Sequence, residues 1–251
     1  MLSSLILWSA LLAAFLGLVC LVRPLRFLGL RSRRAGAVLL AAGLACAAAT
    51  ALWPARERRS GGSLLIDRFM PVYHFREHHA IRVHATPEAA YRAIRDVTPA
   101  EFRSLGFLMR IRSLPARLLG RAPRRPSANR RILDISSGSS FLYLADEPPR
   151  EVVQGTAGRF WRISGTSVRV ASPEEFLALS DPSVARAVIN FAVTDEGDGW
   201  SRIATETRIA AASPGTRRRF AAYWRLIYPG SSIIRYDWLR AIKRRAEDPK
   251  A

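Results

Sequence analysis

Two uncharged, apolar stretches near the start of the chain are separated by a short run rich in arginine. The first stretch covers 2–22 and the second covers 35–53. At a rise of about 1.5 Å per residue, a helix over either stretch is roughly 30 Å long, which matches the hydrocarbon core of a bilayer. We therefore predict two transmembrane helices and an arginine-rich loop within 1–59, which makes the protein a multi-pass protein of the cell membrane.

Other interpretations of these stretches stay open. A cleaved signal peptide has positive charge before its apolar stretch, whereas here the arginines follow it. The second stretch is mostly alanine, so a buried or interfacial helix is its alternative. Positively charged loops tend to stay in the cytoplasm, and the five arginines between 23 and 34 therefore favour an extracytoplasmic position for the rest of the chain.

After Ser60 the sequence becomes charged, punctuated by proline and alternating in hydrophobicity. We predict a linker and entry segment over 60–76 and one domain over 77–247. From Glu77 to Ala85 the pattern alternates as in a half-buried strand. Thr86 and Pro87 then have the residue types that begin a helix, which we expect to end near Asp96.

A second helical pattern, interrupted by proline, covers 102–119. Further strands are predicted at 139–145, 151–156, 160–163, 167–170, 187–194 and 200–210, with a helical turn at 172–179. Ser213-Pro214 begins a closing helix whose large apolar residues, among them Phe220, Trp224, Ile227, Ile234, Trp238 and Ile242, recur at helical spacing. Pro229-Gly230 should kink or split that helix. This order predicts an α+β fold in which an antiparallel sheet is covered by the long C-terminal helix.

Residues 81–96, IRVHATPEAAYRAIRD, resemble the opening of the START-like superfamily, also called SRPBCC or polyketide cyclase/dehydrase-like. The segments 158–161 (GRFW), 205–208 (TETR) and 219–230 (RFAAYWRLIYPG) are similar to uncharacterised bacterial, often actinobacterial, members. The resemblance covers roughly 64–247 and implies a helix-grip fold. In such a fold a cavity between sheet and C-terminal helix takes up lipids or other apolar molecules. Some relatives catalyse cyclisation or dehydration, and many only bind.

The formal net charge of +19 raises the question of nucleic-acid binding. Nearly all the basic residues are arginine, and the basic runs lack the interleaved aromatic residues that stack on bases. We therefore expect no nucleic acid, and we assign the charge to solubility or to contact with anionic lipid headgroups.

The chain shows no strong motif for a metal, a cofactor or a nucleophile. All four histidines lie between His74 and His84, but in an extended strand His78 and His84 would be about 20 Å apart, too far for one ion. Glycines 155 and 158 indicate close strand packing rather than a phosphate loop. Both cysteines lie in the apolar stretches, so we expect no disulfide in the domain.

Polar residues in the late apolar strands are the candidates for a site. Asn190 alternates with apolar neighbours, and Glu206 and Arg208 share one face of a strand. If that face points outward, the pair is a solvated surface pair, and if it points into the cavity, the pair anchors a ligand or serves as acid/base groups. The ligand-binding candidates are Trp161, Asn190, Glu206, Arg208, Tyr223 and Trp224, the aromatic residues being core residues or cavity wall.

We therefore expect a membrane-anchored, non-catalytic binding domain for a lipid or other apolar small molecule, with membrane lipids and that ligand as partners. The alternatives are a polyketide cyclase/dehydrase-like enzyme and a scaffold with a collapsed cavity. We also expect Trp224→Ala to lower the melting temperature sharply. Substitution of Glu206 or Arg208 by alanine should cost little stability in either of their two roles.

Overall fold

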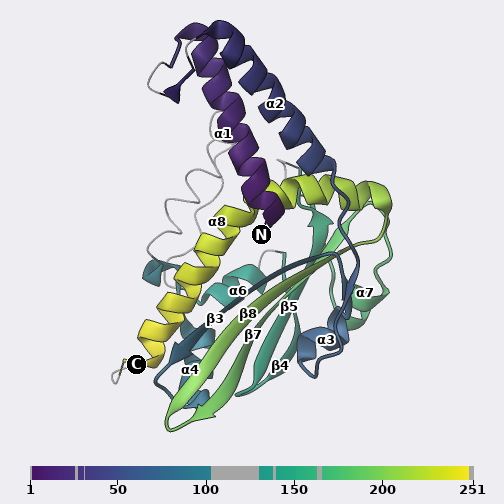
Figure 1. The fold of residues 1–251 in the computed structure, drawn as a ribbon. Coiled ribbons are helices and arrows are strands. Elements are labelled where there is room, and N and C mark those ends of the chain that lie inside the picture. The colour runs from purple at the N-terminus through teal and green to yellow at the C-terminus, as the bar shows by residue number, and fades with distance from the viewer. Residues whose placement is uncertain are drawn as a thin grey trace. The chain divides into compact units, whose positions relative to one another are not determined.

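The computed structural model describes residues 2–25, 28–30, 32–102, 130–137, 140–162 and 166–248. The chain forms two compact units, and each is built from two segments. The first unit comprises Met1–Ala55 and Arg217–Pro229, and the second comprises Arg56–Thr216 and Gly230–Ala251. Figure 1 colours the elements of both units along the chain.

The first unit is built on two antiparallel helices, α1 (Leu2–Val22) and α2 (Arg33–Leu52), which pack closely through small residues (Figure 1). A Cβ atom added to Gly17 would lie 2.4 Å from the backbone nitrogen of Leu40, and one added to Gly43 would lie 2.6 Å from that of Ala14. Only glycine allows the backbones to approach this closely. The large apolar side chains are mostly exposed, for example Phe15 at 60%. Both helices are long and apolar enough to cross a membrane.

The beginning of the C-terminal helix α8 (Pro214–Ala246) completes the first unit. The guanidinium of Arg225 donates hydrogen bonds to the carbonyl oxygens of Ala51 (2.9 Å) and Trp53 (2.7 Å). The last carbonyl groups of a helix have no partner within it, so Arg225 caps the end of α2. The indole N–H of Trp8 in α1 donates to the carbonyl of Leu226 at 3.1 Å.

The second unit contains an antiparallel sheet in the order β3-β8-β7-β5-β4, with β6 also paired to β5. Its strands are β3 (Phe75–Val83), β4 (Leu142–Glu147), β5 (Glu151–Arg159), β6 (Thr166–Val168), β7 (Ala185–Gly197) and β8 (Trp200–Ala211). A separate pair joins β1 (Arg58–Arg59) and β2 (Val72–Tyr73). The short helices are α3 (Leu65–Phe69), α4 (Pro87–Asp96), η2 (Pro99–Glu101), α6 (Ile132–Ser137) and α7 (Pro173–Ala178).

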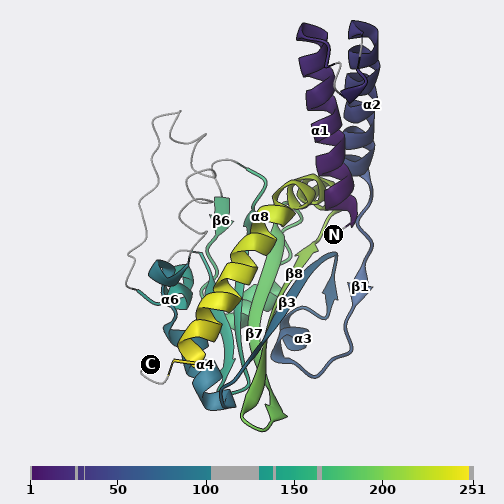
Figure 2. The same cartoon turned by 60° about the vertical axis from the view of Figure 1, so that its left-hand side comes forward.

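One face of the sheet, the inner face, packs against α4, α6 and the later part of α8, which is Gly230–Ala246 (Figure 2). The ring of Phe191 on β7 lies 4.7 Å from that of Trp238 on α8. The fully buried members of this core include Val83, Ile94, Ile203, Leu239 and Ile242. This apolar layer fixes the later part of α8 on the inner face.

The opposite, outer face is covered by α3 and α7, and Figure 2 shows α3 on the other side of the sheet from the later part of α8. Ile66 and Met70 belong to the α3 segment, by which we mean residues 60–70. They pack with Phe176 of α7 over Val153 and Val188 of the sheet. A Cβ atom added to Gly155 of β5 would meet Leu144 Cδ1 at 2.6 Å and Phe176 Cε2 at 3.0 Å. Close packing at this glycine is therefore confirmed.

The predicted fold class is confirmed: an antiparallel sheet packs on the long C-terminal helix. Helix α4 begins as predicted, because the Thr86 hydroxyl accepts from the amide of Ala89 and Pro87 follows. Ser213 caps α8 in the same way. Helix α8 continues through Pro229, but the division between the two units falls between Pro229 and Gly230.

Some predictions differ from the structure. The strand predicted at 160–163 is wrong at Phe160 and Trp161, which lie in a turn after β5. The helix predicted over 102–119 lies outside the described residues except for Phe102. The segment 60–76, which we expected to be a linker and entry segment, forms α3 and β2 and the start of β3, and contributes to the outer-face core.

Candidate functional site

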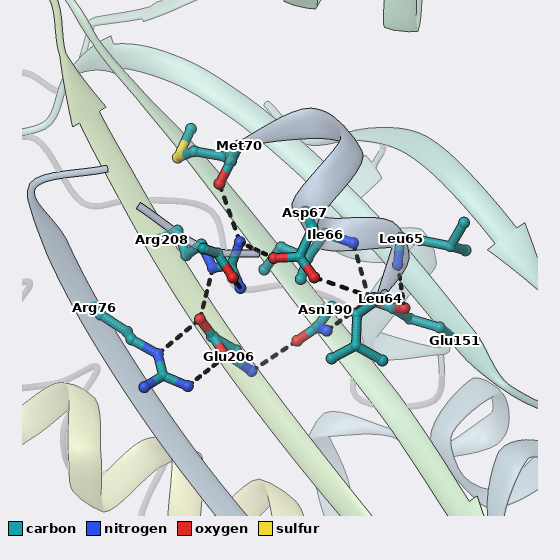
Figure 3. A network of polar contacts seen from close by, with 11 residues as sticks. Leu64, Leu65, Ile66, Asp67, Met70, Arg76, Glu151, Asn190, Glu206 and Arg208 are labelled. Carbon is teal, nitrogen blue, oxygen red and sulfur yellow. Dashed lines mark hydrogen bonds and ion pairs between the residues drawn. The ribbon is translucent and has the colours of Figure 1, made fainter. Parts of the chain in front are cut away.

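Glu206 and Arg208 lie next to each other on the outer face of β8 and are buried, with exposed fractions of 4% and 3%. The Glu206 carboxylate accepts from Arg208 Nε at 2.6 Å and from Arg76 at 2.7 Å (Nε) and 2.8 Å (Nη2). Figure 3 shows the carboxylate between the two guanidinium groups. The alternative that this pair is a solvated surface pair is therefore wrong.

Arg208 uses its remaining nitrogens to hold the α3 segment. Nη1 donates to Asp67 Oδ1 at 2.7 Å and to the carbonyl of Met70 at 3.0 Å, and Nη2 donates to Ser60 Oγ at 3.2 Å. The guanidinium also lies 4.9 Å from the centre of the Tyr73 ring. Each nitrogen of Arg208 thus has an acceptor.

The bonds around Glu206 and Arg208 form a network on the outer face, the outer-face network, and Asn190 of β7 extends it to β5. Its Oδ1 accepts from the Glu206 amide at 2.8 Å, and its Nδ2 donates to Glu151 Oε1 at 2.6 Å. The Glu151 carboxylate, fully buried, also accepts from the amides of Leu65 (2.6 Å) and Ile66 (3.1 Å) at the start of α3. The outer-face network therefore holds α3 to β8 and β5, and Asn190 of β7 links Glu206 to Glu151 (Figure 3).

Two of the carboxylates of this network, Glu206 and Asp67, are paired with arginines. Burial raises the pKa of Glu206, but hydrogen bonds from Arg76 and Arg208 outweigh it and hold that pKa below its usual value. Burial likewise raises the pKa of Asp67, and bonds from Ser60 and Arg208 more than reverse the effect. Both carboxylates are therefore charged at neutral pH. A network whose polar groups satisfy one another stabilises a fold, but it leaves little capacity for a ligand.

The structure thus brings together three of the residues predicted to bind a ligand, Asn190, Glu206 and Arg208. They point to the outer face, away from the later part of α8, and so do not face the grip between sheet and helix. Their contact with a ligand stays a prediction, and their placement gives it no support. Their partners Asp67, Arg76 and Glu151 were missed, although an acid directly before two valines in a strand is a signal for Glu151.

The predicted aromatic site residues lie elsewhere. Trp161 is half-buried in the turn after β5. Tyr223 and Trp224 belong to the first unit, where the Phe220 ring lies 5.7 Å from Tyr223 and 5.8 Å from Trp224. The structure therefore does not assemble the six predicted residues into one site.

A second polar cluster, the inner-face cluster, lies between the sheet and the later part of α8 and was not predicted from the sequence. Glu77 and His79 of β3 are 2% and 6% exposed, and Glu77 Oε1 lies 2.9 Å from His79 Nε2. Ser231 Oγ donates to Glu77 Oε2 at 2.7 Å, and Ser232 Oγ donates to Glu77 Oε1 at 2.8 Å. The signal for Glu77 was its place on the apolar face of an alternating strand.

Arg235 of α8 is the cation of the inner-face cluster and is 9% exposed. Its Nη2 donates to Thr207 Oγ1 at 3.0 Å, while its Nη1 has no hydrogen-bond partner within the described part of the chain. Burial lowers the pKa of Arg235, and the negative charge of Glu77 opposes this. Trp238 Nε1 and Thr156 Oγ1 are likewise buried and without a partner among the described residues. The inner face therefore has hydrogen-bonding capacity that these residues do not use.

The described residues of the inner-face cluster do not have the geometry of a serine–histidine catalytic pair. Both serine hydroxyls donate to Glu77 and none is bonded to His79 in the described residues, whereas a catalytic serine is activated by a histidine. In the described ranges there is also no group of three or more His, Cys, Asp or Glu side chains able to hold a metal ion.

These observations define an α+β protein whose antiparallel sheet packs on the C-terminal helix, preceded by two long apolar helices that pack together. No family model matches the sequence, and no curated protein does.

Three solved bacterial structures are similar to this chain. A conserved protein from Geobacillus kaustophilus is 10% identical, with 68% of this chain and 95% of that chain covered and a TM-score of 0.33. A hypothetical protein from Helicobacter pylori is 6% identical, with coverages of 75% and 98% and a TM-score of 0.34. A protein from Thermus thermophilus is 11% identical, with coverages of 68% and 97% and a TM-score of 0.26. Likenesses at this level carry no argument about function.

Proposed function

We propose that this chain is a membrane-anchored member of the START-like superfamily that binds a lipid or other apolar small molecule without transforming it. The ligand would lie between the inner face of the sheet and the later part of α8. The observation that carries the proposal is that Nη1 of Arg235 in that layer has no hydrogen-bond partner among the residues that the structure describes.

A buried donor without a partner destabilises a protein by about 1–3 kcal/mol, and a charged donor by more. An oxygen of a bound molecule next to Arg235 and the indole N–H of Trp238 would remove this cost. The rest of that molecule would contact the apolar side chains of the inner face, such as Phe191 and Ile203. An apolar molecule that carries an acceptor group fits these requirements.

The tether follows from the exposed apolar surface of α1 and α2. Side chains such as Leu12 and Phe15 are 59% and 60% exposed, and in water such surface is unfavourable. We propose that both helices span the membrane, with the arginine-rich loop in the cytoplasm and the second unit outside it.

The test uses the full chain in nanodiscs of one defined lipid. Apolar compounds are extracted and identified by mass spectrometry against empty nanodiscs. We expect a compound enriched with the wild-type chain and lost with Arg235→Gln. The matched control is Arg240→Gln, because Arg240 lies on the same helix and is exposed. The proposal fails if no compound is enriched, or if the two variants retain it equally.

The second candidate is an enzyme acting on an apolar substrate, and the observation that favours it is the buried Glu77–His79 pair. A carboxylate and an imidazole within hydrogen-bonding distance of each other are groups that general acid–base catalysis uses. Incubation of the recovered compound with the chain separates the two functions. Conversion of the compound that Glu77→Gln abolishes would favour the enzyme, and an unchanged compound would favour the binding domain.

A further inference from the structure

We infer that Arg217–Pro229, the first part of α8, is an interfacial helix that lies on the membrane and binds anionic lipid headgroups. This rests on the proposal above that α1 and α2 span the bilayer. The inference concerns the first unit alone and adds a third membrane-contacting element to it.

The position follows from the hydrogen bonds at the end of the helical pair. Arg225 donates to carbonyls at Ala51 and Trp53, where α2 ends, and the end of a spanning helix lies at the boundary between membrane and water. Trp8 donates to Leu226 and lies about 9 Å from the start of α1 at 1.5 Å per residue. Because α1 begins at the end where α2 finishes, both contacts place Arg217–Pro229 at one membrane boundary.

The side chains of the segment have the chemistry of that boundary. It carries Tyr223, Trp224 and Tyr228, and tryptophan and tyrosine are enriched at membrane–water interfaces. Trp8 and Trp53, the neighbours in α1 and after α2, are 46% and 63% exposed. Tyr223 and Trp224 are half-buried and Tyr228 is buried, so Trp8, Trp53, Tyr223 and Trp224 are the aromatic side chains that can contact the membrane at this end of the helical pair.

Charge selects the kind of lipid. The segment contains four arginines and no acidic residue. Arg225 is used to cap α2, whereas Arg218 and Arg219 are exposed. Leu226 is also exposed, at 46%, so an apolar side chain is available on the surface of the same helix. A helix with exposed arginines and exposed apolar surface binds anionic bilayers by both interactions.

The first test measures depth in the full chain, with Cys20 and Cys46 replaced by alanine and one spin label introduced. The protein is reconstituted in vesicles of phosphatidylcholine and phosphatidylglycerol. Collision with oxygen, which concentrates in lipid, is compared with collision with a water-soluble nickel complex. The label positions are Leu226→Cys, Thr194→Cys as an exposed control on β7, and Leu12→Cys within α1.

We expect oxygen collisions to exceed nickel collisions at 226 and 12, and the reverse at 194. The inference is overturned if the label at 226 behaves like the label at 194 or is shielded from both reagents. If the label at 12 is exposed to lipid in the same experiment, the proposal that α1 and α2 span the membrane still holds. A label at 12 in water overturns the membrane spans themselves, and the inference with them.

The second test concerns the anionic headgroup. In vesicles of phosphatidylcholine alone, the label at 226 should lie closer to water than in vesicles containing phosphatidylglycerol. Substitution of both Arg218 and Arg219 by serine should abolish this difference, whereas Arg202→Ser, at an exposed arginine of the sheet, should preserve it. A difference between the two lipid mixtures that survives the double substitution would overturn headgroup binding by these arginines.

Discussion

The substitution Glu206→Gln separates a stabilising network from a ligand site. Glutamine keeps the size of the side chain but replaces one acceptor oxygen by an amide nitrogen and removes the charge. Arg76 can turn towards water, because its side chain is 41% exposed. Arg208 cannot, because its side chain is 4% exposed and is fixed to Asp67 and to the α3 segment. The substitution therefore leaves a buried guanidinium without one of its two carboxylates.

Removal of one partner of a buried ion pair costs about 3–5 kcal/mol. The bonds from Arg208 to Asp67, Met70 and Ser60 remain, so we expect a loss of about 3 kcal/mol in the free energy of unfolding, at the lower end of that range. For a domain of 150–250 residues, each kcal/mol lowers the melting temperature by roughly 2–4 °C. The melting temperature of Glu206→Gln is thus expected to fall by about 6–12 °C.

The assay is thermal unfolding of the full chain in detergent, followed by circular dichroism and tryptophan fluorescence. Glu196→Gln is the matched control, because that carboxylate also pairs with two arginines, Arg82 at 2.7 Å and Arg202 at 2.6 Å, but at the surface. Exposed ion pairs contribute little to stability, so the melting temperature of the control variant should fall much less. Equal shifts in the two variants would refute the stabilising role of the outer-face network. The prediction also replaces the expectation from sequence that alanine at position 206 costs little stability.

Three further outcomes are expected. Because the folded pKa of Glu206 is lowered, its contribution to stability is complete above the ordinary value of 4.5 and is lost as the pH falls through the folded pKa. The free energy of unfolding of Glu206→Gln should therefore fall less steeply with decreasing pH than that of the wild type. An equal pH dependence in the two proteins would contradict this. Gly17→Val should force α1 and α2 apart and lower the thermal stability of the first unit in detergent, whereas Ala45→Val at an exposed position of α2 should not. Trp238→Ala should destabilise the second unit by about 3–5 kcal/mol, as measured by denaturant unfolding. Trp224→Ala, for which the sequence predicted a sharp loss, should leave that unit's transition nearly unchanged because Trp224 lies in the first unit; an equal loss in both variants would contradict this assignment.

The sequence by itself determined the local structure wherever a period or a cap was present. Alternation identified β7 and β8, and therefore the shared face of Glu206 and Arg208, because successive side chains of a strand point to opposite faces. Thr86 with Pro87 fixed the start of α4, because a hydroxyl at that position accepts from a backbone amide of the first turn. The two apolar stretches likewise became α1 and α2 with nearly the predicted bounds.

Only the tertiary structure decided which segments cover each face of the sheet. Alternation distinguishes two faces but does not say what packs on either one. Helix α3 has five residues, too few for a helical period to be visible, yet it covers Glu206 and Arg208. The inner-face cluster joins Glu77 of β3 to Ser231, 154 residues further along the chain. Such partners are set by the packing of distant segments, and burial and charge pairing depend on that packing rather than on local sequence.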